Sequence, residues 1–208
     1  MFITIEGIDG CGKSTQARLL AERLADDDCP VVWTKEPGGW RNGETLRTLL
    51  LEGCLVHPLS ELFLFLADRG EHVHQVIHPA LAAGQTVLCE RYSDSTLAYQ
   101  SWGRGIPSER IEDLLRWADF PVPDITVLID LPTEAACARL RRRGAPDRLE
   151  REGATFLDRV RKGFSVLAAR EPHRIVTLDG MKPVGQIADE IYALVRAKRP
   201  AQADRGRS

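Results

Sequence analysis

The chain has 208 residues, of which 43% are hydrophobic, and a formal net charge of −2. This length and composition predict one compact domain or a domain with a small insertion. The near-neutral charge gives no general attraction to nucleic acid or to a membrane surface, and no apolar stretch approaches the length of a bilayer span. Five scattered cysteines without a C-x-x-C pair predict reduced thiols in a cytoplasmic protein.

Strand-like and helix-like patterns alternate along the chain. Strands are expected at 2–6, 31–35, 86–90, 125–130 and 174–178, and helices near 14–25, 44–52, 61–83, 109–118, 133–143, 152–170 and 185–198. This alternation predicts an α/β fold, in which a parallel sheet is flanked by helices on both faces. The domain is expected to span residues 1–197, and the polar tail 198–208 is expected to be disordered.

A glycine-rich segment, GIDGCGKST, follows the first expected strand and precedes the first expected helix. It matches the phosphate-binding pattern G-x-x-x-x-G-K-[ST], and the strand, loop and helix context supports the match. Its glycines let backbone amides surround a phosphate chain at a helix N-terminus. We expect ATP phosphates on Lys13 and on the loop residues Gly7, Gly10, Cys11, Gly12, Ser14 and Thr15, with Mg²⁺ at the Ser14 hydroxyl.

A second group of arginines and aromatic residues stands after the next expected strands. Glu36 and Pro37 are followed by Arg47, and the run Glu90-Arg91-Tyr92 is followed by Ser95, Thr96 and Tyr99. Phe65 and Arg69 are four residues apart, which places them on one helix face. Arg47 and Arg91 suit an anionic group, while Phe65 could stack on a ring whose edge Arg69 reads. These residues predict a nucleoside monophosphate site that faces ATP.

Taken in order, these motifs resemble those of bacterial thymidylate kinases (dTMP kinases) over residues 1–195. The matching segments are GIDGCGKST, EPGG with LRTLLL, the Phe65–Arg69 run, ERYSDSTLAYQ, GRGI, PDITVLID and RRRGAPDRLE. The resemblance implies a P-loop NTPase fold with a five-stranded parallel sheet and a short arginine-rich lid. It also implies transfer of the ATP γ-phosphoryl group to dTMP, a cytoplasmic location and a homodimer.

The resemblance further assigns roles to individual residues. Asp9, Ser14 and Glu90 would surround Mg²⁺, and Asp9 would also lie near the 3′-hydroxyl of the acceptor. Arg47 and Arg91 would hold the dTMP phosphate. The remaining acceptor contacts would come from Glu36, Pro37, Phe65 stacked on thymine, Arg69 on its carbonyl edge, Ser95 or Thr96 on the base, and Tyr99 beneath the deoxyribose.

An arginine-rich segment at about 139–151 resembles the family's lid. It holds Arg139, Arg141, Arg142, Arg143 and Arg148. The phosphate loop offers Gly10 and Cys11 where some members of the family carry an arginine, so the resemblance moves the transition-state charge to the lid. Arg143 and Arg148 are therefore expected to be catalytic, with Arg141 at ATP. An arginine in such a position contributes on the order of 10³–10⁵ in rate.

Two positions depart from the family pattern, and two other functions stay open. Glu90 replaces the usual aspartate, which could change the metal geometry, and Trp40 follows Glu-Pro-Gly-Gly where threonine is common. One alternative is a kinase of another nucleoside monophosphate or of a deoxynucleoside. The other is a nucleotide-binding regulatory module without acceptor-dependent turnover. His74 and His78 are four residues apart but lack a third ligand, so no structural metal is expected there.

Overall fold

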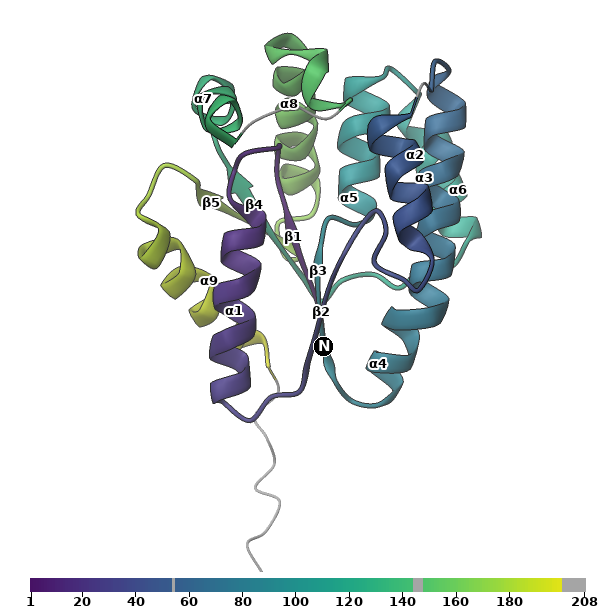
Figure 1. Ribbon diagram of the computed structural model, residues 1–208. Coiled ribbons are helices and arrows are strands. Elements are labelled where there is room, and N and C mark those ends of the chain that lie inside the picture. The colour runs from purple at the N-terminus through teal and green to yellow at the C-terminus, as the bar shows by residue number, and fades with distance from the viewer. Residues whose placement is uncertain (54, 144–147, 200–208) are drawn as a thin grey trace, which may run out of the picture.

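The computed structural model describes residues 1–53, 55–143 and 148–199 (Figure 1). One sheet holds five parallel strands in the order β2-β3-β1-β4-β5. The strands are β1 (Phe2–Glu6), β2 (Val31–Lys35), β3 (Thr86–Glu90), β4 (Ile125–Asp130) and β5 (Ile175–Asp179). The central strands are almost continuously apolar and buried, as expected when helices cover both faces of a parallel sheet. The predicted five-stranded parallel sheet is confirmed.

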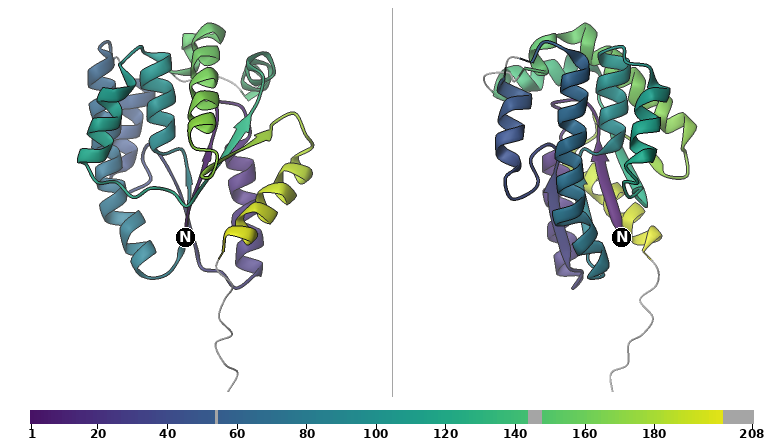
Figure 2. Two further views of the ribbon diagram at one scale, coloured as in Figure 1. Left: turned by 180° about the vertical axis from the view of Figure 1, so that it is seen from behind. Right: turned by 90° about the vertical axis from the view of Figure 1, so that its right-hand side faces the viewer.

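Helices cover both faces of this sheet (Figure 2). Helices α1 (Lys13–Asp26) and α9 (Val184–Lys198) pack together on one face, while α4 (His78–Ala82) and α8 (Ala154–Arg170) contact the strands from the other. The remaining bounds are α2 (Gly43–Glu52), α3 (Pro58–His72), α5 (Ser93–Thr96), α6 (Ser108–Trp117) and α7 (Thr133–Arg143). Within the described residues, no helix is long and apolar enough to cross a bilayer.

The helix expected at 61–83 is longer and interrupted. It begins at Pro58, where the His57 side chain caps the first turn by accepting from the Leu59 N–H at 3.2 Å. A π-helical turn at Val73–Ile77 then separates α3 from α4. Pro79 explains the interruption, because proline has no N–H to donate to the preceding turn.

A helical segment at 93–103 was not expected from the sequence. Helix α5 continues into a π-helical turn, Leu97–Gly103, which packs closely on α8. Serine, aspartate and threonine open this segment, and their intrinsic helix propensity is low. Tertiary packing therefore stabilises the helix, and it places Ser95, Thr96 and Tyr99 on a rigid element.

The C-terminal helix extends slightly beyond the expected domain limit at residue 197. Helix α9 includes Lys198, whose ammonium group donates to the carbonyl oxygens of Asp124 and His173. Arg199 lies 3.8 Å from Asp27. These two residues therefore belong with the fold, and the rest of the expected tail, 200–208, lies outside the described residues.

Candidate active site

The loop between β1 and α1 has the shape of an anion-binding turn. Gly7 has φ 137°, and a Cβ there would lie 2.5 Å from the Ile129 carbonyl oxygen, so only glycine fits. Helix α1 begins after Gly12 without a side-chain cap and without an acidic residue in its first turn. Its first amides are thus available to a negative ligand. Lys13 donates to the carbonyl oxygens of Gly7 and Ile8 at 3.1 and 3.0 Å.

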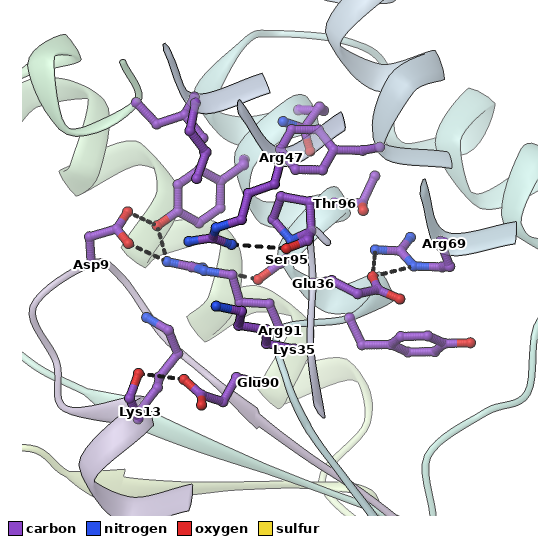
Figure 3. Close-up of a pocket in the computed structure, with 18 of the residues that line it drawn as sticks. Asp9, Lys13, Lys35, Glu36, Arg47, Arg69, Glu90, Arg91, Ser95 and Thr96 are labelled. Carbon is purple, nitrogen blue, oxygen red and sulfur yellow. Dashed lines mark hydrogen bonds and ion pairs between the residues drawn. The ribbon is translucent and has the colours of Figure 1, made fainter. Parts of the chain in front are cut away.

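A cavity of about 450 Å³ adjoins this loop (Figure 3). Most of the residues expected in the two sites line it together: Asp9, Gly12, Lys13, Ser14, Thr15, Glu36, Pro37, Arg47, Phe65, Arg69, Glu90, Arg91, Ser95, Thr96 and Tyr99. Gly7, Gly10 and Cys11 shape the loop from outside this lining set. One cavity therefore unites the phosphate loop with the arginine and aromatic group.

Other lining residues had no assigned role in the sequence-based prediction. These are Lys35, Leu51, Tyr92, Gln100 and Leu149. Lys35 ends β2, so the rule that ligands bind at the carboxyl ends of parallel strands could have found it. Leu51 and Leu149 carry no chemical signal in the sequence, and only the packing of α2 against the lid segment brings them to the cavity.

Asp9 and Arg91 form an ion pair in the cavity wall. Arg91 donates to Asp9 at 2.5 Å and to the Ser95 hydroxyl at 3.1 Å, while the Tyr99 hydroxyl donates to the other Asp9 oxygen at 2.7 Å. Burial alone raises the pKa of Asp9, but the charges of Arg91 and Lys13 and the Tyr99 hydrogen bond outweigh it and lower the pKa. Asp9 is therefore a carboxylate at neutral pH.

Arg91 has an unusual backbone conformation for a residue with a side chain. Its φ of 64° lies in the left-handed region, which costs about 1–3 kcal/mol. Buried Glu6 supports the turn after β3 by accepting from the Tyr92 N–H at 2.7 Å and from the Ser95 hydroxyl at 2.6 Å. Burial, together with repulsion from Asp94, raises the pKa of Glu6 to about 7. This carboxyl group helps to hold Arg91 toward the cavity.

Arg69 is fixed by a buried ion pair with Glu36. Only 1% of Arg69 is exposed, and its Nε and Nη2 lie 2.8 and 2.7 Å from Glu36 Oε2. His72 contacts the other Glu36 oxygen at 3.0 Å. The third nitrogen, Arg69 Nη1, is buried and has no hydrogen-bond partner in the described part of the chain. Glu36 therefore orients Arg69 at the cavity and leaves one donor free.

Trp40 belongs to the loop that follows β2 and lies outside the lining set. Its indole N–H donates to Asp68 at 2.8 Å, and the Gly38 N–H donates to both oxygens of the same carboxylate at 3.0 Å. Arg47 donates to the Pro37 carbonyl oxygen in this loop at 2.9 Å. The Trp40 side chain thus fastens the loop that follows β2 to α3.

Ser14 and Glu90 bring two oxygen atoms together beside the phosphate loop. The Ser14 hydroxyl donates to Glu90 Oε2 at 2.5 Å, and the Trp33 indole N–H donates to Glu90 Oε1 at 3.0 Å. Hydroxyl and carboxylate oxygens are ligands that Mg²⁺ favours, and Mg²⁺ usually needs only one or two protein ligands beside phosphate and water.

The lid segment holds Arg148 away from the phosphate loop. Arg148 donates to the Leu50 carbonyl oxygen at 2.9 Å and to Glu61 at 2.6 Å, and it is outside the lining set. Arg148 was expected to supply charge to the transition state, but in this structure the buried Glu61 carboxylate of α3 attracts it instead. Arg139 contacts the loop instead, 3.5 Å from the carbonyl oxygens of Gly10 and Cys11. Arg141 is exposed on α7, and the side chain of Arg143 lies outside the described residues.

Comparison with known proteins decides the family. The family model described as thymidylate kinase matches residues 5–191. The chain belongs to the thymidylate kinase family. Among curated members, it is 48% identical over 201 residues to the thymidylate kinase of Synechococcus sp. (strain JA-2-3B'a(2-13)), covering 96% of each chain. It is 44% identical to the thymidylate kinase of Pseudomonas fluorescens (strain SBW25), covering 94% of each.

A solved thymidylate kinase has the same architecture. The crystal structure of thymidylate kinase from Ehrlichia chaffeensis superposes with a TM-score of 0.78 at 37% sequence identity. The match covers 94% of this chain and 98% of that one. The family relationship and the fold relationship thus extend over nearly the whole chain.

Proposed function

We propose that the cavity binds dTMP opposite ATP and is the place of phosphoryl transfer. Membership in the thymidylate kinase family makes the chain an ATP-dependent dTMP kinase that yields dTDP and ADP. The observation that carries the proposed site is the single cavity in which Lys13 and Ser14 face the arginine and aromatic group.

The donor end of the cavity suits the triphosphate of ATP. Loop amides and the N-terminus of α1 would bind the phosphates, and Lys13 would exchange its two loop carbonyls for phosphate oxygens. We propose Mg²⁺ at Ser14 and Glu90, with Asp9 nearby. When bound, this ion neutralises phosphate charge. The 2.5 Å contact between the Ser14 and Glu90 oxygens supports the assignment.

The acceptor end suits a nucleoside monophosphate. Arg47 and Arg91 would bind its phosphate, and Phe65 would stack on thymine. Arg69 would hydrogen-bond a carbonyl on the edge of the base, and its ion pair with Glu36 in the cavity wall supports this role by fixing the guanidinium group. Ser95 or Thr96 would contact the base. Tyr99 would lie beneath the sugar, where a ribose 2′-hydroxyl would collide.

The chemistry requires positioning and charge neutralisation more than proton transfer. An oxygen of the dTMP phosphate is already anionic at neutral pH, so it can attack the γ-phosphorus without a general base. One bond forms between these atoms, and the bond from the γ-phosphorus to its bridging oxygen breaks, with the electron pair leaving on ADP. Cations around the cavity reduce the repulsion between the two anions and align them.

The lid arginines complete the proposed mechanism. Arg148 and Arg143 would supply charge to the transferring phosphoryl group, and Arg141 would bind ATP. Since Arg148 is paired with Glu61, this role requires Arg148 to leave Glu61 so that phosphate replaces the carboxylate. Arg139 already reaches the loop and supports the approach of α7 to the donor end.

An acceptor panel tests the proposed specificity. ADP release is measured with dTMP, dCMP, dGMP and thymidine at fixed MgATP, and dTMP is expected to give by far the highest kcat/KM. Equal turnover with the other acceptors would contradict the dTMP site. ATP binding without acceptor-dependent turnover would indicate a regulatory nucleotide-binding module.

We also propose a homodimer through α3 in the cytoplasm. Phe63 is 55% exposed, and Leu59 is exposed one turn earlier on the same helix face, so the pair forms an apolar surface suited to a second copy. The free cysteines among the described residues support a reducing compartment. Light scattering tests the dimer: Phe63→Glu should halve the molar mass, and an unchanged mass would place the interface elsewhere.

A further inference from the structure

Glu90 makes a different hydrogen bond with each of its carboxylate oxygens. Ser14 on α1 donates to Oε2 at 2.5 Å, and Trp33 on β2 donates to Oε1 at 3.0 Å. In the parallel register Lys35 pairs with Glu90 and Trp33 pairs with Leu88. Side chains two residues apart on a strand share a face, so Trp33 and Glu90 lie on the same side of the sheet.

Two donors orient this carboxylate better than one. A glutamate side chain has several rotatable bonds, and its ordering costs conformational entropy. The Ser14 hydroxyl fixes one oxygen but leaves the carboxylate plane free to turn about it. A second donor on the other oxygen removes this freedom. The indole N–H suits this purpose because it can only donate.

Trp33 also has no other evident reason to be tryptophan. It is 44% exposed, and it is not one of the described residues that line the cavity. Its ring therefore contributes little to the core and does not contact the proposed nucleotide site. Its polar atom nevertheless reaches the buried carboxylate beside Ser14.

We propose that Trp33 is a positioning residue that orients Glu90 toward Ser14 and the metal site. The inference rests on the Mg²⁺ site described under the proposed function. Trp33 acts through Glu90 alone, so its removal should weaken the Mg²⁺-dependent part of nucleotide binding and spare the rest. Loss of such an outer partner costs 10–100-fold in metal affinity or activity. For a half-exposed donor we expect about tenfold.

The test uses binding of a fluorescent ADP analogue with and without Mg²⁺. The measured quantity is the Kd without Mg²⁺ divided by the Kd with Mg²⁺. It is determined for the unmodified chain and for Trp33→Phe, Glu90→Gln and the double variant. Trp33→Phe should reduce this ratio about tenfold while leaving the Mg²⁺-free Kd unchanged. The double variant should match Glu90→Gln, since Trp33 has no effect without the carboxylate. Trp117→Phe, at a highly exposed tryptophan outside the lining set, is the matched control and should equal the unmodified chain.

Several results would overturn the inference. One is an unchanged ratio in Trp33→Phe, and another is an equal loss of Mg²⁺-free binding in that variant. A third is a double variant whose reduction of the ratio equals the product of the two single reductions. An unchanged ratio in Glu90→Gln would remove the metal role of Glu90 itself, and the inference with it. A reduced ratio in Glu90→Gln beside a normal one in Trp33→Phe would overturn only the role of Trp33. If Trp33→Phe folds poorly, Trp33→Leu replaces it, because leucine also lacks the N–H donor and should reduce the ratio similarly. An unchanged ratio in Trp33→Leu would contradict the role of the indole N–H.

Discussion

Arg148 Nη2 lies 2.6 Å from Glu61 Oε2, and this ion pair joins the lid segment to helix α3. Glu61 is buried and also accepts hydrogen bonds from Arg104 and Gln100. Burial raises the pKa of Glu61, but these donors outweigh burial and lower it. The carboxylate is therefore a strong competitor for the arginine on which the proposed mechanism depends.

The first prediction separates a catalytic Arg148 from a structural one. Arg148→Ala should lower kcat about a thousandfold with little change in the KM for dTMP, because the arginine would stabilise charge that develops in the transition state. Glu61→Gln keeps a neutral acceptor and frees the arginine, so it should change kcat far less. Steady-state kinetics of both variants decide the question. Equal losses in the two variants would mean that Arg148 only anchors the lid.

Lys13→Met should remove nearly all turnover. Methionine keeps the length of the side chain but has no charge, and the loss of one donor to developing phosphate charge costs about 10²–10³ in kcat. Lys13 also holds the carbonyl oxygens of Gly7 and Ile8, so thermal melting must accompany the kinetics. A folded variant that keeps more than about a tenth of the activity would argue against a phosphate contact.

Phe65→Ala should mainly raise the KM for dTMP. Stacking of an aromatic side chain on a base contributes about 1–3 kcal/mol, which corresponds to a change on the order of tenfold or more. Phe65→Tyr preserves the ring and serves as the matched control, with a KM close to that of the unmodified chain. An unchanged KM in Phe65→Ala would exclude stacking and leave this residue as a packing contact of the cavity.

Glu6 predicts a pH dependence of stability. Folding raises its pKa from 4.5 to about 7. Between these values the unfolded chain has released the proton while the folded chain still holds it. The free energy of unfolding therefore falls as the pH rises, by at most about 3 kcal/mol from this group. Glu6→Gln cannot ionise, so its stability relative to the unmodified chain should increase between pH 5 and pH 8. Urea denaturation at both values measures this difference, and a constant difference would refute the assignment.

Local patterns were sufficient to predict the sheet and the phosphate loop. Apolar runs such as Phe2–Glu6 and the spacing of Gly12, Lys13 and Ser14 carry their meaning within a few residues. The arginine and aromatic residues after the next strands, including Phe65 and Arg69, predicted a nucleoside monophosphate site, and the family resemblance identified the acceptor as dTMP. The structure gathers these residues in one cavity, while their individual roles stay predictions.

Long-range contacts could not be predicted in the same way. Arg148 and Glu61 are 87 residues apart, and Trp33 and Glu90 are 57 apart. No periodicity specifies which carboxylate an arginine will choose, because the choice depends on packing of the whole domain. The helical segment that begins at Ser93 was missed for a related reason, since burial against α8 stabilises it and local propensity does not.

The ion pairs of Arg91 with Asp9 and of Arg148 with Glu61 have a consequence for ligand selection. Each arginine already has an internal carboxylate that stands in for a phosphate group. A charged nucleotide must share or displace these carboxylates, so its measured affinity is the difference between two sets of ion pairs. An uncharged thymine-like compound that stacks on Phe65 leaves both pairs intact. Neutral inhibitors of this cavity should therefore gain more affinity per contact than their phosphorylated counterparts.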